Sequence, residues 1–338
     1  MKPTLISRKQ FLLGAGAVGA VGLCAPRAYA RRPITIRFGF DDHDDPVIWN
    51  ATLAGKQIEE KTKGRIKFEV FPSNQLGNDD HMLSGVRSGA IEMMAINDSI
   101  LSGLVPAAAI DAVGFAFKDS NTAWRALDGK VGEIVYGEIL KHGLRPMRRV
   151  WNEGFREITS STKPINTPAD LKGFKIRVPP SPILVSLFDH LNAAPTAINV
   201  AALYSALQTK VVDGQENPLG VIESHKMYEV QKYCSLTNHA WSGYWIITGD
   251  SFWQSMSPED QNIVETTFND IAPKQRSEMK DVNDSMQANL SKQGMIFNAP
   301  KQEPFREVLK ASGFYKMWKQ KLGSQLWAAL EEYTGPLT

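Results

Sequence analysis

The sequence predicts an α/β protein with two domains. Its 338 residues are enough for two domains, and a composition of 43% hydrophobic and 22% charged residues is ordinary for a globular protein. Apolar residues between positions 34 and 70 follow a strand, helix, strand order, which is typical of a βαβ unit in a parallel sheet. A second run of this kind covers residues 174–215. These patterns exclude a fibrous or disordered chain.

The first thirty residues have the pattern of a secretory signal. Three basic residues precede an apolar run at residues 11–23, and an Ala-Tyr-Ala triplet that ends at residue 30 fits a signal-peptidase site. The apolar run is too short to span a bilayer. We therefore expect residues 1–30 to be a cleaved signal peptide and the mature chain to be exported to the periplasm. A near twin-arginine pattern at residues 7–12 leaves both the Sec and the twin-arginine routes open.

Loss of this signal removes four basic residues and changes the formal net charge from +2 to −2. A chain of this charge lacks the basic surface that nucleic acids require, so no nucleic-acid partner is expected. Cys234 becomes the only cysteine, which excludes an intrachain disulfide and leaves stability to a hydrophobic core. Residues 14–19 match a dinucleotide-binding fingerprint, but they lie in the predicted signal without a preceding strand, so we expect no cofactor.

The first elements of the mature chain are strands separated by helices. Alternating apolar residues indicate strands at residues 34–40, 66–70 and 90–96. A helix is predicted at residues 46–63, with Gly64 as its stop. The βαβ order predicts that these strands are parallel.

Polar residues follow each of these three strands. Asp41 begins an acidic run at residues 41–45, Asp79 ends the loop after the second strand, and Asn97 follows the third. Ligands of an open α/β sheet bind outside the carboxyl ends of its strands, so these positions are candidates for a binding site.

The acidic run at residues 41–45 suggests a cation site, but adjacent strand-end residues point to opposite sides and few can converge on one ion. Its carboxylates instead suit the positive N-terminus of the following helix. No two histidines stand three or four residues apart, which removes the usual helical zinc pattern. We therefore expect no metal.

The rest of the chain adds an extended segment at residues 143–159 and a strand at residues 241–247. Ser257 followed by Pro258 and two acids is a strong helix start, and the helical pattern continues to about residue 292. A helix of this length is about 50 Å long, which is enough to span both domains.

A carboxylate-binding pair is predicted within residues 170–219. Arg177 ends a strand at residues 174–178, and Asn217 lies just past a second strand at residues 210–215. The planar fork of an arginine matches a carboxylate, and an asparagine can add a donor to the same oxygens. The alternative is that Arg177 forms an ordinary surface salt bridge.

Four motifs resemble one transport family. They are FEVFPSNQLGND at residues 68–79, NEGFREIT at 152–159, GFKIRVP at 173–179 and YSALQTKVVDGQENPL at 204–219. Together they are similar to the extracytoplasmic receptors of TRAP transporters, the tripartite ATP-independent periplasmic class that imports organic anions. The resemblance extends over nearly the whole mature chain.

This resemblance implies the two-domain periplasmic binding protein fold with hinge segments. Domain I is expected at residues 31–153 plus about 242–282, and domain II at residues 154–241 plus about 283–338. The domains of such receptors close on a carboxylate-bearing solute, and the receptor then docks on membrane permease subunits.

The resemblance also implies the roles of individual residues. Arg177 is the main partner of the solute carboxylate, Arg156 assists it, and Asn217 completes the clamp. Looser positions of the site are Asp41, Asp79 and Asn97.

Aromatic residues suggest what the solute body is. Trp151, Trp241, Tyr244 and Trp245 are close to the predicted cleft in sequence, and if two of them face it the solute is expected to be a sugar acid or an aromatic acid, with a dicarboxylate also open. The alternative is that these side chains belong to the hydrophobic core. Tyr244 and Trp241 are three residues apart on a strand, so they lie on opposite faces, and Tyr244 is the one expected to contact solute. Departures from the sialic-acid pattern at Asn97, Pro180 and Val200 disfavour that solute.

Two other functions are compatible with part of the pattern. A receptor of this type can serve a signalling partner in place of a permease. An exported enzyme acting on an organic acid is the other alternative, but the sequence lacks a nucleophile elbow, an HExxH motif and a P-loop. The chain is therefore predicted not to be an enzyme.

Overall fold

The computed structural model describes residues 33–338, so the predicted signal peptide lies outside the described residues. The strands are β1 Ile34–Gly39, β2 Ile66–Phe71, β3 Met93–Asn97, β4 Leu144–Pro146, β5 Trp151–Ser160, β6 Lys175–Val178, β7 Ala194–Ala197, β8 Gly214–Asn217, β9 Tyr233–Gly249 and β10 Ile296–Asn298. The α-helices are α1 Pro46–Lys61, α2 Asp79–Ser88, α3 Asp98–Leu101, α4 Ser120–Leu127, α5 Lys130–Lys141, α6 Pro182–His190, α7 Leu203–Gln208, α8 Leu219–Ser224, α9 Asp250–Ser255, α10 Pro258–Lys292, α11 Glu303–Ala311, α12 Phe314–Leu322 and α13 Ser324–Thr334. Short 3-10 helices are η1 Pro106–Ile110, η2 Pro168–Leu171, η3 Val200–Ala202 and η4 Met227–Glu229.

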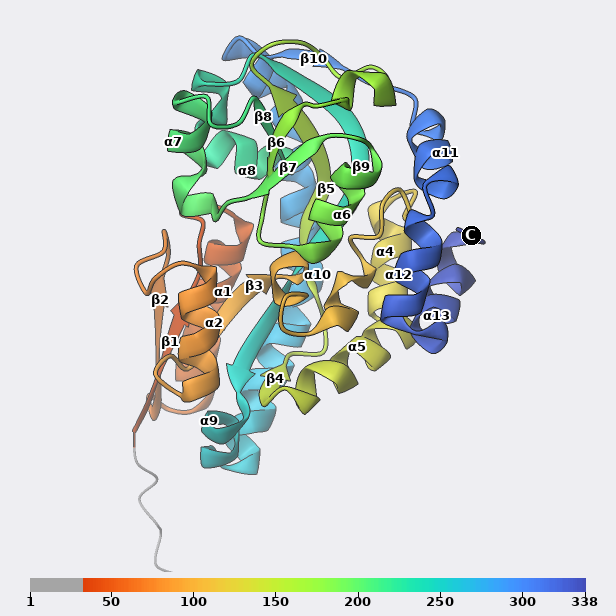
Figure 1. Ribbon diagram of the computed structural model, residues 1–338. Helices are drawn as coiled ribbons and strands as arrows, with labels where there is room; N and C mark the ends of the chain where they lie inside the picture. The colour runs from red at the N-terminus through yellow and green to blue at the C-terminus, as the bar shows by residue number, and fades with distance from the viewer. Residues whose placement is uncertain (1–32) are drawn as a thin grey trace, which may run out of the picture. The chain divides into compact units, whose positions relative to one another are not determined.

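These strands form one mixed sheet in the order β2-β1-β3-β9-β5-β8-β6-β7, with β4 and β10 paired to β9. β1 pairs in parallel with β2 and β3, and β6 pairs in parallel with β7 and β8. The expectation of a purely parallel sheet is wrong at the centre, where β9 runs antiparallel to both β3 and β5. The βαβ pattern of the sequence predicts the two groups of parallel strands, but it does not predict that the long strands β5 and β9 join them (Figure 1).

Strands β5 and β9 change partners along their length. The start of β9 pairs with β10 and its end pairs with β3 and β4, while the end of β5 pairs with β8. The β5–β9 ladder shifts register at two places, between Asn152 and Gly154 and between Arg156 and Ile158. Gly154 has a φ of 128°, and a Cβ at this position would lie 2.6 Å from Nδ2 of Asn283. A residue with a side chain therefore cannot take its place without local rearrangement.

The long helix is confirmed from Pro258 to Lys292. Ser257 is its N-cap, with its side chain accepting a hydrogen bond from the Asp260 backbone at 3.2 Å. α10 packs against α1 at one end and against α8 and β10 at the other, and it also contacts β5 (Figure 1).

One predicted strand is wrong in its position. Residues 209–213 form a turn, with Lys210 at a φ of 59°, and β8 begins only at Gly214. Val211 and Val212 favour a strand by their propensity, but in the structure they belong to the turn that follows helix α7. The predicted helix at 46–63 ends two residues early, at Lys61.

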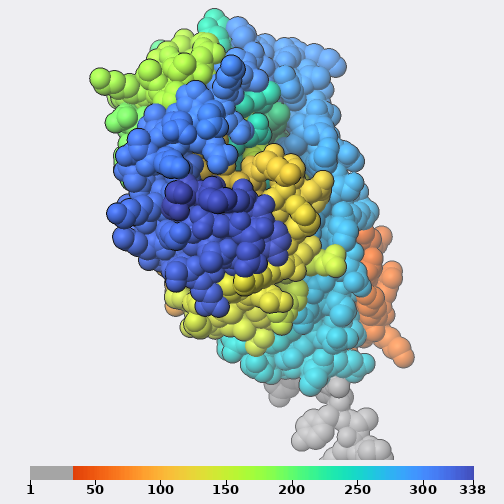
Figure 2. Space-filling model, turned by 90° about the vertical axis from the view of Figure 1, so that its right-hand side faces the viewer, coloured from red at the N-terminus to blue at the C-terminus, as the bar shows by residue number. Residues whose placement is uncertain are grey.

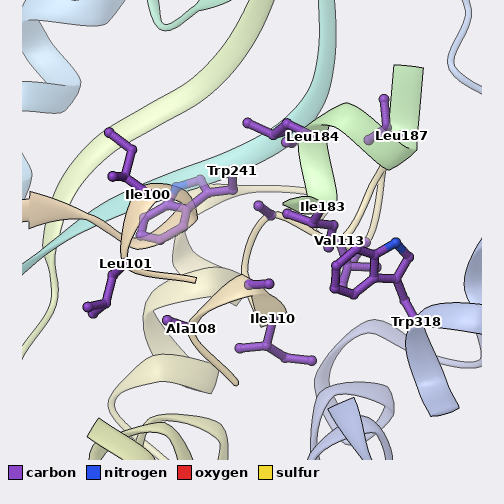
Figure 3. Packing of buried hydrophobic residues seen from close by; sticks show 14 of the residues in the cluster. Ile100, Leu101, Ala108, Ile110, Val113, Ile183, Leu184, Leu187, Trp241 and Trp318 are labelled. Carbon is purple, nitrogen blue, oxygen red and sulfur yellow. The ribbon is translucent and has the colours of Figure 1, made fainter. Parts of the chain in front are cut away.

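The hydrophobic core of the described residues forms three clusters. The largest joins α3 and η1 to α6 and the C-terminal helices, and Figure 3 shows Trp241 beside Ile100 in this cluster and Trp318 beside Val113. The C-terminal helices α11–α13 (dark blue) lie next to residues 118–141 (yellow) on the face in Figure 2. None of the helices within residues 33–338 is long and apolar enough to cross a membrane.

A second cluster lies between the β1 group and α10. Phe268 of α10 is fully buried there, with ring centroids 6.1 Å from Phe38, 5.9 Å from Phe68 and 5.7 Å from Trp151. Trp151 therefore belongs to this core.

Removing the Phe268 ring is expected to destabilise the protein. Phe268→Ala should lower the free energy of unfolding by about 3–5 kcal/mol, because a buried aromatic ring leaves a cavity among other rings. Ile296→Ala is the control, since Ile296 is 49% exposed and should change stability by less than about 1 kcal/mol. Urea denaturation measures both, and equal losses would contradict the assignment of Phe268 to the core.

Candidate functional site

Strand ends from both parallel groups meet at one small cavity of about 20 Å³. Its lining residues are Asp41, Asp42, Asn97, Ile100, Glu153, Arg156, Arg177, Pro179, Val200, Asn217, Val221 and Tyr244. The structure thus brings together six of the eight predicted site residues. In this conformation the cavity is about the size needed for one water molecule.

Arg177 is a buried cation without an ion pair. It is 1% exposed at the third residue of β6, and its Nε donates to the carbonyl of Ile198 at 2.7 Å. No salt bridge or further hydrogen bond of Arg177 is present within residues 33–338. Burial lowers the pKa of the guanidinium to about 10, and the neighbouring Arg156 acts in the same direction. A surface salt bridge, the alternative considered for Arg177, is excluded by its burial.

Arg156 differs from Arg177 because its donors are already used. Its Nε donates to Oε2 of Glu216 at 2.5 Å, and Nη2 donates to Oδ1 of Asn217 at 2.8 Å. Nη1 donates to Oε2 of Glu153 at 3.2 Å. Although burial disfavours the charge, Glu216 and Glu153 raise the pKa of Arg156 above its usual value. Arg156 therefore holds β5 and β8 together and positions Asn217.

Glu216 is a buried partner that the sequence analysis missed. Besides Arg156, it contacts His239, whose Nε2 lies 3.0 Å from Oε2 of Glu216. Burial lowers the pKa of His239, whereas Arg156 overcomes the effect of burial and holds the pKa of Glu216 below its usual value. The signal available in the sequence was the position of Glu216 between Gln215 and Asn217 at the end of a strand.

Asn217 lies at the last residue of β8 with both ends of its amide engaged. Its oxygen accepts from Arg156, and its nitrogen donates to Oε1 of Gln215 at 2.6 Å. One hydrogen of the amide nitrogen remains for a solute, since this nitrogen carries two.

Glu153 links three predicted or neighbouring site residues. It accepts from Nδ2 of Asn97 at 2.5 Å, from the Tyr244 hydroxyl at 3.0 Å and from Arg156. Burial raises the pKa of Glu153 to about 7, against the influence of Arg156. Glu153, like Glu216, was not among the predicted site residues.

Tyr244 lines the cavity, whereas Trp241 packs into the separate core cluster with Phe117. The expectation that these residues occupy opposite sides of β9 is confirmed. Trp151 does not line the cavity, which corrects its predicted contact with solute. Its ring is buried against Phe268, because the apolar face of α10 covers the start of β5.

Asp79 also lies outside the lining of the cavity. It begins α2, is buried, and lies close enough to Arg177 for the two charges to interact. Burial raises the pKa of Asp79 to about 6, and Arg177 and Asn199 oppose this effect. Asp79 thus acts on the site through Arg177 and does not face the cavity.

The acidic run after β1 serves partly as a helix cap. Oδ1 of Asp45 accepts from the backbone nitrogens of Val47 and Ile48 at 2.9 and 3.0 Å, as the N-terminus of α1 requires. Within residues 33–338 no group of three or more His, Cys, Asp or Glu side chains is placed to hold a metal ion.

The family model for bacterial extracellular solute-binding protein, family 7, matches residues 41–320. The chain belongs to this family. It is 34% identical over 277 residues to the 2,3-diketo-L-gulonate-binding periplasmic protein YiaO of Escherichia coli, with 82% of each chain covered. The resemblance to the receptors of TRAP transporters is therefore confirmed.

Solved structures of TRAP periplasmic solute-binding proteins share the fold of this family 7 receptor. One from Polaromonas with bound D-erythronate has a TM-score of 0.84 at 27% identity and covers 88% of this chain and 98% of its own. Another, from Sulfurospirillum deleyianum with bound succinate, has a TM-score of 0.83 at 27% identity and covers 90% and 99%. The predicted two-domain α/β fold of the periplasmic binding proteins is confirmed.

Glu157 is a buried carboxyl group outside the lining of the small cavity. It lies beside a larger, solvent-open hollow of about 520 Å³ between α4, β5 and α10. Glu157 lines it but is 4% exposed, and Oε2 of Glu157 accepts from the Asn238 backbone at 2.8 Å. Burial raises the pKa of Glu157 from 4.5 to about 8, since no cation lies against it in the described part of the chain.

The raised pKa of Glu157 predicts a pH dependence of stability. The folded protein holds this proton more tightly than the unfolded chain, so the contribution is complete below pH 4.5 and is lost as pH rises to about 8. Glu157→Gln retains an oxygen acceptor without the charge, and it should lose less stability than wild type between pH 5 and pH 8.5. Exposed Glu133→Gln is the control and should follow wild type. Chemical denaturation at several pH values measures how the free energy of unfolding changes with pH. The same change with pH in all three proteins would contradict the prediction.

Proposed function

We propose that this family 7 receptor captures a carboxylate-bearing organic anion in the periplasm and delivers it to the membrane permease subunits of a TRAP transporter. The observation that carries the proposal is Arg177, a buried guanidinium that forms no ion pair within residues 33–338 and lies near Arg156, whose donors are already used. A buried charge without a partner is unfavourable, and an anion at the cavity removes this penalty.

Arg177 supplies the geometry as well as the charge. Its two Nη groups have no partner within residues 33–338, and a carboxylate can accept from both of them in a bidentate pair. Asn217 can add one donor from its amide nitrogen. Arg156 supports the clamp by holding Asn217 and Glu216, so its role is positioning.

The relatives bind carboxylates of more than one type. Diketogulonate and erythronate are sugar acids with one carboxylate, and succinate has two. We infer a sugar acid, an aromatic acid or a dicarboxylate for this chain, and no chemical turnover of the solute. Mass spectrometry of a bound solute after incubation tests the last point, since unchanged solute is expected.

The domains proposed here are residues 31–153 plus about 242–282, and residues 154–241 plus about 283–338. The partner changes and register shifts of β5 and β9 near these boundaries support hinges there. Because the cavity between the strand ends holds little more than one water molecule, a solute requires the two halves to separate before it enters.

The direct test of the proposed function is a thermal-shift screen of residues 31–338 with dicarboxylates, sugar acids, aromatic acids and keto acids. A ligand at 100 times its dissociation constant stabilises the folded state by about 2.7 kcal/mol, which such a screen detects. Absence of stabilisation by every carboxylate would reject the proposed function. Capture of permease subunits by the solute-loaded receptor distinguishes transport from signalling.

Replacement of Arg177 is expected to abolish tight binding. Arg177→Ala leaves the solute carboxylate buried without its cation, which costs about 3–5 kcal/mol and weakens binding at least about a hundredfold. Arg177→Lys keeps the charge but loses the planar fork, so it should restore only part of the affinity. Asn217→Ala should cost about 1.5–3 kcal/mol.

Isothermal titration calorimetry with a solute from the screen measures these losses. Exposed Arg87→Ala is the matched control and should bind as wild type. If Arg177→Ala stays folded and binds within a few-fold of wild type, the carboxylate is held elsewhere.

Solute binding is also expected to change the compactness of the receptor. Small-angle scattering should give a smaller radius of gyration with saturating solute than without it, because the two halves close around the solute. Arg177→Ala under the same conditions is the control and should stay in the state without solute. An unchanged scattering curve for wild type would argue against closure.

A further inference from the structure

A second cavity of about 130 Å³, called the chamber below, lies beside the cavity at Arg177, called the clamp cavity. The two share Asp42, Glu153, Val221 and Tyr244 in their linings. A cavity of about 150 Å³ in another protein holds a benzene molecule, so this chamber has room for several carbon atoms. A solute whose carboxylate lies at Arg177 therefore extends past Glu153 and Tyr244 into the chamber.

Apart from the Tyr244 phenol, the ionisable side chains that line the chamber all carry carboxyl groups. Its carboxyl-bearing residues are Asp42, Asp44, Asp45, Glu153 and Glu223. No lysine or arginine of residues 33–338 lines it, and the two arginines of the clamp cavity, Arg156 and Arg177, are at the other end. The two ends of the site thus differ, because arginine side chains line only the cavity at Arg177.

Asp42 is the carboxylate common to both cavities. It is 2% exposed, its Oδ1 accepts from the His43 backbone at 2.9 Å, and its Oδ2 accepts from the Ser224 hydroxyl at 3.1 Å. Despite its burial, contacts with His43 and His225 hold the pKa of Asp42 below its usual value. Asp42 therefore presents a negative charge to the far end of the solute.

The opposite wall of the chamber is mostly apolar. It consists of Met279, Val282 and Met286 from α10 together with Trp49, whose indole nitrogen donates to Asp44 at 2.7 Å. A carbon chain can lie against this wall while its polar substituents face the carboxylates.

We propose that this receptor selects monocarboxylates whose far end carries hydrogen-bond donors and no negative charge, with Asp42 as a specificity-determining residue against dicarboxylates. The inference rests on the proposed function, since Arg177 must hold the first carboxylate. A second carboxylate in the chamber meets the charged Asp42 and further carboxyl groups, and no lysine or arginine of residues 33–338 lines the chamber to pair with it, which opposes binding. Hydroxyl or ammonium groups instead donate to the carboxylate oxygens, which have free lone pairs.

Matched pairs of acids test this inference by calorimetry. D-gluconate and D-glucarate, or D-galactonate and galactarate, differ only in whether the far end is a hydroxymethyl group or a carboxylate. We expect the monoacid to bind with a dissociation constant at least about tenfold lower than that of its matched diacid. The pair 4-aminobutyrate and succinate tests an ammonium group at the far end, and preference for the amino acid identifies ammonium as the donor.

A diacid that binds as tightly as its matched monoacid, or tighter, would overturn the inference. So would binding of benzoate-type acids with no binding of donor-bearing acids, although the proposed function would then stand. If no carboxylate binds at all, the proposed function fails and the inference fails with it.

Two variants test the residues of the chamber. Asp42→Asn should narrow the ratio of monoacid to diacid affinity at least about threefold, because it removes a like charge from the second carboxylate. Glu223→Gln, at a half-buried position of the same wall, should act in the same direction and serves if Asp42→Asn fails to fold. Asp281→Asn is the control on the exposed surface of α10 and should keep the wild-type ratio. If both Asp42→Asn and Glu223→Gln keep the wild-type ratio of monoacid to diacid affinity, these residues do not select the solute and the inference is overturned.

Discussion

The site depends on one unbalanced charge. Arg177 near the end of β6 and Arg156 in the middle of β5 are both buried and line the same cavity, but Arg156 is paired with Glu216 and Glu153, whereas Arg177 has no ion pair within residues 33–338. Removal of a cation from water without compensation is costly, so the fold can retain such a group only because the rest of the structure fixes it. In the proposed function an anionic solute supplies the missing compensation, which would link binding to closure of the site.

The scaffold around this charge is built to bring distant residues together. Parallel strands on two sides of the sheet end at the same cavity, and β5 and β9 connect the two sides. Glu153 on β5 contacts Asn97 of β3 and Tyr244 of β9, while Arg156 on the same strand contacts β8. A short stretch of one strand therefore carries the hydrogen bonds that align both halves of the site. The register shifts in this stretch are where a hinge can bend without breaking the sheet.

Family membership and solute selection rest on different parts of the site. The proposed clamp of Arg177 and Asn217 would recognise a carboxylate, the group that the bound ligands of the related structures share. The chamber beyond it differs in chemistry, with carboxylates on one wall and α10 on the other. In this proposal the clamp determines the affinity for a carboxylate and the chamber determines the selectivity among acids. Substitutions in the chamber can therefore change selectivity without loss of the carboxylate site.

The sequence by itself determined the local structure and the residue types of the clamp. Its apolar periodicity predicts β1, α1 and β2, and the Ser257 cap predicts the start of α10, because these features depend on neighbours in the chain. The motifs also point to Arg177 and Asn217, whose role as a clamp is the proposal made above. Only the tertiary structure decided that β9 runs antiparallel, that Trp151 is core, that Arg156 is paired, and that Asp42 and Glu153 face the solute chamber. These properties depend on contacts between residues far apart in the chain, such as Arg156 with Glu216 or Trp151 with Phe268, and no local pattern encodes which partner is reached.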